Sequence, residues 1–285
     1  MAVIQARGLR KSFKDVRALD GFDMQVDKGR IVGLIGPNGS GKTTALKAML
    51  GLSQLDGGEL TVLDKNPARQ RAALMENVAY IADTGILPKW MRVHDLLNYV
   101  EDVHPGFDRT VAEAQLARTE ISLHKRVRVL SKGMHVQLHL AIVLAIGAEL
   151  LVLDEPTLGL DILYRQQFYD GVLNDYFTDQ RSILVTTHEV REIEHILTDV
   201  VFIHHGKACL SLAMDRIGEE YVKLVSAEHT SLPRQPIYTH RTLAGVESIF
   251  QGVDPAQLES LGELATPNLA ELFVAVVEGS AGGQA

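Results

Sequence analysis

The chain has 285 residues, of which 46% are hydrophobic, and carries a formal net charge of −8. This length and composition allow a full buried core with room for one large and one smaller domain, which excludes a disordered or fibrous protein. The acidic balance, with no basic run longer than residues 125–128, predicts that nucleic acid is not a partner.

Cys209 is the only cysteine, so a disulfide within the chain is excluded and a reducing compartment is expected. The N-terminal residues lack the apolar core of a signal peptide. The longest apolar stretch, residues 138–153, contains His139 and Glu149, and Gly147 divides a helical pattern from a strand-like one. We therefore expect a cytoplasmic protein without a membrane-spanning segment.

In chain order, the first elements are strands. Short alternating apolar runs over residues 3–26 predict a strand-rich antiparallel lobe. Residues 31–35 are typical of a buried strand, and a glycine-rich loop separates them from a helix expected at residues 44–50.

The chain then alternates between strands and helices up to residue 203. Strands are expected at residues 78–82, 150–153, 183–186 and 200–203, and helices at residues 93–103, 111–120, 133–146 and 162–176. This alternation predicts a mostly parallel α/β fold.

Beyond a turn at residues 205–207 the pattern weakens. Strands are expected at residues 221–225 and 247–252, a helix at residues 266–277, and a disordered tail at residues 279–285. Residues 216–285 are therefore predicted to form a small C-terminal α+β extension with a flexible tail.

The loop GPNGSGKTT matches the spacing G-x-x-x-x-G-K-[ST] of a phosphate-binding P-loop. Glycine lets backbone N–H groups turn inward as a nest of donors, and the following helix points its positive end at the anion. Lys42 is expected to reach the terminal phosphates, and Thr43 to ligate Mg²⁺. A turn with a chance lysine is the alternative, which the rarity of the match disfavours. The candidate nucleotide contacts are Gly36, Pro37, Asn38, Gly39, Ser40, Gly41, Lys42, Thr43 and Thr44.

Three further segments carry polar residues suited to the same site. In LLVLDEPTLGLD, Asp154 ends an apolar strand where it can hold Mg²⁺, and Glu155 is a candidate base for a water; an ordinary strand-to-turn junction is equally consistent. In VLSKGM, Ser131 and Gly133 begin a helix and are expected to face an anion, with a plain N-cap as the alternative. His188, in LVTTHE, is a candidate γ-phosphate contact or an ordinary loop residue.

In this order the motifs resemble the ATP-binding cassette (ABC) family over residues 3–210. Residues 36–44 resemble the Walker A motif, LSKGM at residues 130–134 the LSGGQ signature, and residues 150–155 the Walker B motif. Residues 158–161 are similar to the D-loop. LSKGM, together with PNLAELF at residues 267–273, resembles the ATPase subunits of bacterial ABC-2-type exporters.

The resemblance implies a P-loop NTPase fold over residues 1–215, with a RecA-like core, an antiparallel β lobe and an α-helical signature subdomain at about residues 84–148. It implies that Phe13 stacks on adenine and that His188 is the switch histidine. It also implies ATP and Mg²⁺ as cofactors and a dimer with a second ABC ATPase subunit. Each ATP then lies between one Walker A motif and Ser131 and Gly133 of the other subunit.

The sequence departs from the family pattern in two places. The signature has Lys132 and Met134 in place of glycine and glutamine, yet keeps Ser131 and Gly133. At the Q-loop position the family usually has glutamine and this chain has Asp83. A carboxylate ligates Mg²⁺ more directly but adds negative charge beside the γ-phosphate, so Asp83 is a candidate catalytic residue and metal ligand.

Two other features leave alternatives open. Trp90 lies in a turn with Leu87 and Met91, which is equally typical of an exposed docking patch and of a core position. His135 and His139 lie one helical turn apart, but no metal-binding motif surrounds them and a metal site is disfavoured.

Two functions fit these observations. The first is an ATP-hydrolysing subunit of a membrane exporter, bound to a separate transmembrane permease subunit on the inner face of the cell membrane. The second is a soluble ABC ATPase that drives protein assembly or remodelling. A P-loop kinase or GTPase is disfavoured because no N-K-x-D segment is present.

Overall fold

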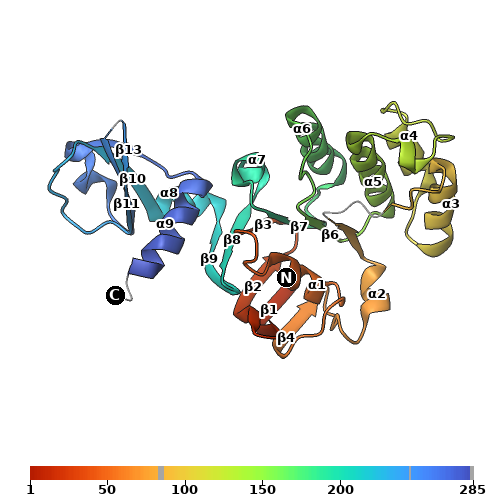
Figure 1. Ribbon diagram of the computed structural model, residues 1–285, viewed down its shortest axis with the longest axis horizontal. Helices are drawn as coiled ribbons and strands as arrows, with labels where there is room; N and C mark the ends of the chain where they lie inside the picture. Colours follow the sequence, from red (N-terminus) through yellow and green to blue (C-terminus); the bar gives the residue numbers. More distant parts are fainter. Residues whose placement is uncertain (83–86, 244, 283–285) are drawn as a thin grey trace.

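The computed structural model describes residues 1–82, 87–243 and 245–282. At the centre of the fold is a sheet with the strand order β5-β6-β7-β3-β8-β9 (Figure 1). Its strands are β3 Ile31–Ile35, β5 Val78–Ile81, β6 Leu150–Asp154, β7 Ser182–Thr187, β8 Asp199–His204 and β9 Lys207–Ala213. All pairs are parallel except β8 and β9. Every residue of β3, β6 and β7 is buried, as expected for strands covered on both faces. The prediction of a mostly parallel α/β fold is confirmed.

A second sheet, in the order β2-β1-β4, forms the predicted antiparallel lobe. Its strands are β1 Ala2–Phe13, β2 Val16–Asp27 and β4 Gly57–Val62. The buried side chains of this sheet share a core with α1 (Lys42–Met49) and with the central sheet. Strand β4 was not predicted, because Leu60 and Val62 are its only buried apolar residues.

A helical part lies beyond β5 at the opposite end of the molecule from the C-terminus (Figure 1). Its helices α3 (Val93–Val103), α4 (Arg109–Leu116) and α5 (Lys132–Ile146) surround a core of their own that includes Leu97, Leu116 and Ile142. Helix α4 begins earlier than expected because the Asp108 side chain accepts hydrogen bonds from the N–H groups of Thr110 and Val111. The helices before the C-terminal part are α2 Arg71–Met75, α3 Val93–Val103, α4 Arg109–Leu116, α5 Lys132–Ile146, α6 Ile162–Gly171, which continues as a π-helical turn over Val172–Tyr176, and α7 Val190–Ile193.

The C-terminal part contains an antiparallel sheet in the order β11-β12-β10-β13. Its elements are α8 Ile217–Glu220, β10 Tyr221–Ser226, β11 Tyr238–Thr242, β12 Gly245–Gln251, β13 Gly262–Ala265 and α9 Leu269–Gly282. The prediction of disorder from residue 279 is wrong for residues 279–282, which continue α9. Gly279 approaches the residue before β11 closely, since a Cβ atom on it would lie 2.6 Å from the carbonyl oxygen of Ile237. Residues 283–285 lie outside the described residues.

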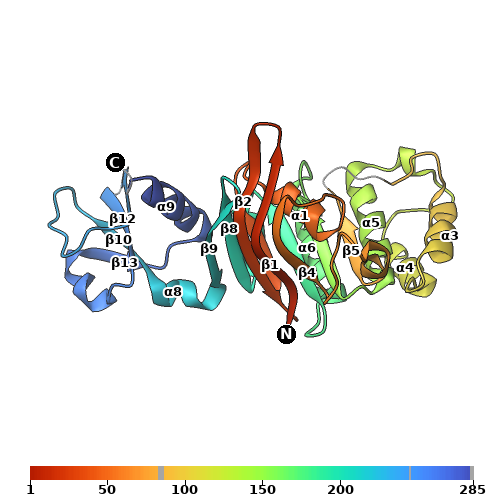
Figure 2. The same ribbon diagram turned by 90° about the horizontal axis from the view of Figure 1, so that it is seen from below.

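Helix α9 also packs against the central sheet. Leu269, Leu272 and Ala275 are buried in the same core as residues of β8 and β9, and the ring of Phe273 meets that of Phe202 edge-on at 5.1 Å. Figure 2 shows α9 beside β9. The extension is therefore joined to the central sheet by apolar packing, while its boundary at residue 216 stays a prediction.

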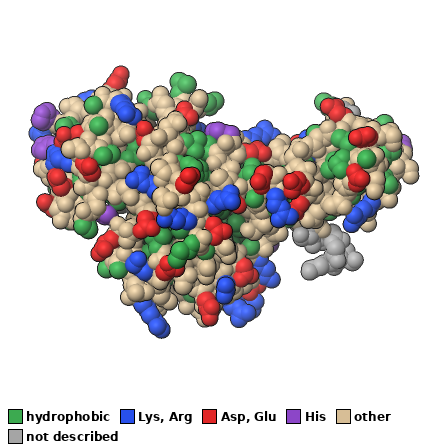
Figure 3. Space-filling model, turned by 180° about the vertical axis from the view of Figure 1, so that it is seen from behind, with side chains coloured by type: hydrophobic (Ala, Val, Ile, Leu, Met, Phe, Trp, Pro, Cys, Tyr) green, Lys and Arg blue, Asp and Glu red, His purple; other side chains and the backbone are tan. Residues whose placement is uncertain are grey.

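The surface in Figure 3 intersperses Lys and Arg with Asp and Glu, and the C-terminal part projects from the main body. Within the part of the chain that the structure describes, no helix has the length and apolar character needed to cross a membrane.

Candidate active site

The glycine-rich loop joins the end of β3 to the start of α1, and its path depends on glycine. A Cβ atom on Gly36 would lie 2.3 Å from the carbonyl oxygen of Ile203, so the loop runs directly against β8. Gly41 has a φ of 114°, and a Cβ atom there would lie 2.5 Å from the carbonyl oxygen of Ala18. Side chains at either position would push the loop off its two neighbours, and its N–H groups would lose their arrangement.

A pocket of about 520 Å³ opens above this loop. It brings together residues from four separate segments, three of which meet because parallel strands end at one edge of the sheet, while the fourth is the start of β2 in the antiparallel lobe. The lining residues are Val16, Ala18, Pro37, Asn38, Gly39, Ser40, Gly41, Lys42, Thr43, Thr44, Asp154, Glu155, Leu158 and His188. Sequence reasoning missed Val16, Ala18 and the role of Leu158 in this wall, because strand β2 and the segment after Glu155 reach the pocket only through the tertiary fold.

Lys42, Glu155 and His188 form a connected set of charged and polar groups. Lys42 Nζ donates to the carbonyl oxygen of Gly36 at 2.6 Å and lies 3.4 Å from Glu155 Oε1. His188 Nδ1 lies 2.9 Å from Glu155 Oε2, at hydrogen-bond distance. The side chains of Lys42 and Glu155 are 6% and 12% exposed, so their attraction is little screened by water. A phosphate group can therefore bind Lys42 Nζ only when Lys42 gives up its contacts with the Gly36 carbonyl oxygen and with Glu155.

The backbone of Glu155 has a φ of 48°, a left-handed conformation that is uncommon outside glycine. Its N–H group donates to the carbonyl oxygen of Thr186 at 3.1 Å, which anchors the residue to β7. Such backbone conformations concentrate at functional sites, where they aim a side chain that regular structure would point elsewhere. Here the conformation directs the Glu155 carboxylate at both Lys42 and His188.

Asp154 is held by the neighbouring strand. The hydroxyl of Thr186 donates to Asp154 Oδ1 at 2.7 Å, and both side chains are buried. Thr186 stands in the LVTTHE segment, where only the histidine was singled out. Adjacent parallel strands place Asp154 opposite Thr186, so the hydroxyl residue on β7 was the available signal.

The residues present fit a magnesium nucleotide. Ser40 Oγ is buried and has no hydrogen-bond partner among the described residues. The Thr43 hydroxyl and the Asp154 carboxylate are the hard oxygen donors that Mg²⁺ prefers, and Mg²⁺ commonly takes few protein ligands together with substrate phosphates. Among the described residues, no three His, Cys, Asp or Glu side chains are grouped so that they could hold a metal ion.

The other predicted site residues lie elsewhere or at the margin. Ser131 and Gly133 begin α5 and do not line the pocket. Phe13 is half exposed at the end of β1 and pairs with Val16, which does line it. Asp83 lies outside the described residues.

The residues at the start of α5 also have structural roles within their own chain. The Ser131 hydroxyl accepts from the N–H group of Met134 at 3.2 Å, as an N-cap does. A Cβ atom on Gly133 would lie 2.8 Å from ring carbons of Tyr164, so glycine lets α5 and α6 approach. Lys132 Nζ donates to the carbonyl oxygen of Leu158, which links the signature segment to the D-loop segment of the same chain.

A polar network not expected from the sequence supports the segment after Glu155. Thr157 Oγ1 lies 3.2 Å from both Glu192 Oε2 and the hydroxyl of Tyr169, and Arg165 forms an ion pair with Glu192. Arg165 Nε also donates to the carbonyl oxygen of Leu160 at 2.7 Å. Burial raises the pKa of Tyr169 to about 12, so its hydroxyl stays protonated. The network ties residues 157–160 to α6 and to α7, which follows His188.

One of the two open alternatives outside the pocket, the environment of Trp90, is resolved. Trp90 is 71% exposed, so the interpretation as a core residue is wrong. Leu87 and Met91 pack partly against the core of the helical part. Burial lowers the pKa of His139 to about 4, so this histidine is neutral near pH 7.

Known proteins that are similar to this chain are named as ATP-binding proteins, in agreement with the nucleotide site that the geometry suggests. Residues 19–158 match the family described as "ABC transporter". The chain is 31% identical over 227 residues to the Nod factor export ATP-binding protein I of Bradyrhizobium diazoefficiens, covering 75% of this chain and 72% of that protein. It is 29% identical over 230 residues to the ABC transporter ATP-binding protein YtrB of Bacillus subtilis, covering 81% and 78%.

Two further comparisons concern drug resistance and structure. The daunorubicin resistance ATP-binding protein DrrA2 of Streptomyces coeruleorubidus is 29% identical over 246 residues, covering 81% of this chain and 74% of that protein. The solved structure of an ATP-binding subunit of an ABC transporter superposes with a TM-score of 0.68 at 25% identity, covering 76% of this chain and 92% of that one.

Proposed function

The chain belongs to the ABC transporter family as an ATP-hydrolysing subunit, and we propose that it drives export across the cell membrane through a separate transmembrane permease subunit. The observation that most directly supports ATP hydrolysis as the driving reaction is the pocket that joins the P-loop to Asp154, Glu155 and His188. Relatives named for Nod factor export and daunorubicin resistance favour an exporter over a soluble remodelling ATPase. The permease would hold the chain at the inner face of the membrane.

The proposed chemistry assigns one task to each group in the pocket. The loop N–H groups and Lys42 bind the β- and γ-phosphates of ATP, and the exposed half of Phe13 offers a stacking surface for adenine. Thr43 and Asp154 hold Mg²⁺, which neutralises phosphate charge when bound. Glu155 orients and deprotonates the attacking water, and His188 fixes the Glu155 carboxylate through the 2.9 Å contact.

The proposed active unit is a dimer, because Ser131 and Gly133 lie outside the pocket of their own chain. In the dimer, the start of α5 from one subunit faces the ATP of the other. Ser131→Arg inserts bulk and charge at that surface, so it should abolish ATP-driven dimerisation and hydrolysis while each monomer still binds ATP. Ser122→Arg, on an exposed residue of the same helical part, is the control and should change neither.

Mixing two inactive variants tests the shared site more sharply. A mixed dimer of Ser131→Arg with Lys42→Ala has one composite site with both halves intact, so part of the ATPase activity should return. Normal hydrolysis by Ser131→Arg alone, or no recovery in mixtures that demonstrably dimerise, would refute the shared-site arrangement.

The proposed permease surface is the exposed apolar set formed by Trp90, Tyr99 and Val103, which is called the docking patch below. Tyr99 and Val103 are four residues apart on α3 and share one face, and Trp90 precedes that helix. Trp90→Ser with Tyr99→Ser should reduce copurification with a multi-span membrane protein and leave basal ATPase activity unchanged. Leu52→Ser, on an exposed residue of the central part, is the matched control. Undiminished copurification would contradict this docking patch.

A further inference from the structure

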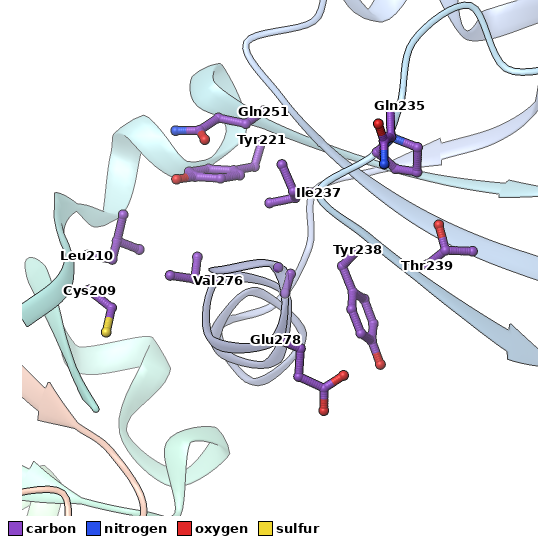
Figure 4. A pocket seen from close by; sticks show the side chains of 13 residues that line it. Cys209, Leu210, Tyr221, Gln235, Ile237, Tyr238, Thr239, Gln251, Val276 and Glu278 are labelled. Atoms are coloured by element: carbon purple, nitrogen blue, oxygen red, sulfur yellow. The ribbon is translucent and has the colours of Figure 1, made fainter. Parts of the chain in front are cut away.

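A second pocket, of about 730 Å³, lies between helix α9, the sheet of the C-terminal part and the edge strand β9 of the central sheet (Figure 4). None of the residues proposed for ATP binding or hydrolysis lines it. Its volume falls within the range of sites that bind drug-sized molecules. The pocket therefore has the dimensions of a binding site that the proposed function does not use.

The lining combines apolar and aromatic side chains with neutral polar ones and with one carboxylate. Leu210, Ile237 and Val276 provide apolar walls, and Tyr221 contributes a ring that is almost fully buried in the fold. Figure 4 shows these side chains pointing into a common space. Apolar walls of this kind favour a ligand with a hydrophobic body.

The polar end of the pocket is acidic. Figure 4 shows the carboxylate of Glu278 beside the ring of Tyr238. Burial, Glu278 and Glu247 together raise the pKa of Tyr238, which keeps its phenol neutral and reflects negative surroundings. Among the described residues, the lining includes no Lys or Arg side chain to balance Glu278.

From this lining we propose that the pocket binds an organic cation with an apolar body, and that its occupancy changes the rate of ATP hydrolysis. A carboxylate and the ring of Tyr238 attract a positive charge, while the apolar walls hold the rest of the ligand. An apolar anion of the same shape would meet the repulsion of Glu278. An inorganic cation such as Mg²⁺ would find too few oxygen ligands.

Two elements of the pocket wall, β9 and α9, also connect to the proposed ATPase site. Strand β9 pairs with β8, which pairs with β3 immediately before the P-loop. At its other end, α9 donates the N–H group of Leu269 to Glu194 Oε1 at 2.9 Å, just after α7 and six residues beyond His188. A ligand bound between β9 and α9 would therefore shift both the strand that leads to the P-loop and the helix that bonds to Glu194. This second half of the proposal rests on the ATPase activity, whereas ligand binding does not.

The binding test uses tetraphenylphosphonium, an apolar cation, and tetraphenylborate, an anion of nearly the same shape. Equilibrium dialysis with the full chain and no nucleotide should show at least tenfold tighter binding of the cation. Glu278→Gln should weaken cation binding about tenfold, and Tyr238→Leu should weaken it while Tyr238→Phe retains it. Glu263→Gln, which removes an exposed acid of the same sheet outside the pocket, is the matched control.

Equal binding of the two ions, or cation binding that Glu278→Gln and Tyr238→Leu leave unchanged, would overturn the proposed site. For the regulatory half, phosphate release is measured with the chain saturated by tetraphenylphosphonium. The rate should change by twofold or more in the unaltered chain and stay constant in Glu278→Gln at the same concentration. An unchanged rate in the saturated chain would overturn the coupling while the binding result stands.

Discussion

Replacing Glu155 by Gln should raise the affinity for ATP and lower the rate of ATP hydrolysis. The substitution removes the negative charge that lies 3.4 Å from Lys42 Nζ. At an effective dielectric constant of 20, two unit charges at that distance attract by about 5 kcal/mol before the cost of burying both is subtracted. Close pairs of opposite charges have net coupling energies of about 1.5–7 kcal/mol, and we take the lower end for this ion pair. Lys42 is then released to a phosphate, so ATP affinity should rise about tenfold.

Turnover should fall in the same variant. An amide cannot accept the proton of the attacking water, so the rate of hydrolysis should drop by roughly 100-fold or more. Nucleotide-bound dimers should accumulate, because they are no longer resolved by hydrolysis. Affinity is measured by equilibrium dialysis with labelled ATP, turnover by phosphate release, and dimerisation by light scattering with MgATP present.

The control is Glu189→Gln, one residue beyond the histidine. Glu189 is 56% exposed and lies 3.8 Å from His188 Nε2, so water screens its charge. It should leave both affinity and turnover within about twofold. Near-normal turnover of Glu155→Gln would remove Glu155 from its role as the base, and unchanged or weaker ATP affinity would refute the reasoning from the Lys42 contact.

Three other variants test separate features. Gly133→Ala places a Cβ atom 2.8 Å from the ring of Tyr164, so it should lower the free energy of unfolding by about 1–3 kcal/mol, and adding Tyr164→Ala should recover part of the loss in urea titrations. Glu192→Leu leaves Thr157 and Arg165 without their carboxylate and should cost about 2 kcal/mol in the same titrations, whereas Glu192→Gln should cost clearly less; equal costs would argue against the network. Asp83→Asn should shift the Mg²⁺ dependence of ATP hydrolysis without abolishing ATP binding, and superimposable Mg²⁺ titrations would make Asp83 a bystander.

Local sequence determined the elements whose geometry depends on near neighbours in the chain. The P-loop was predictable because its shape follows from glycines at set spacings between a buried strand and a helix. The position of Asp154 at the end of β6 was predictable because an apolar run ends there. Strand β4 was not predictable in the same way, since its two buried side chains pack in a core with residues elsewhere in the chain.

The tertiary structure alone decided which distant groups meet. Glu155, Thr186 and Lys42 come from segments far apart in sequence, and they adjoin only because the strand order places β7 between β6 and β3. The same holds for Glu192 with Thr157, and for α9 on the β8–β9 edge. Local patterns carry backbone preference and burial, but contacts between side chains depend on the relative placement of whole elements. That placement arises when the elements bury their apolar faces together, and no single segment contains it.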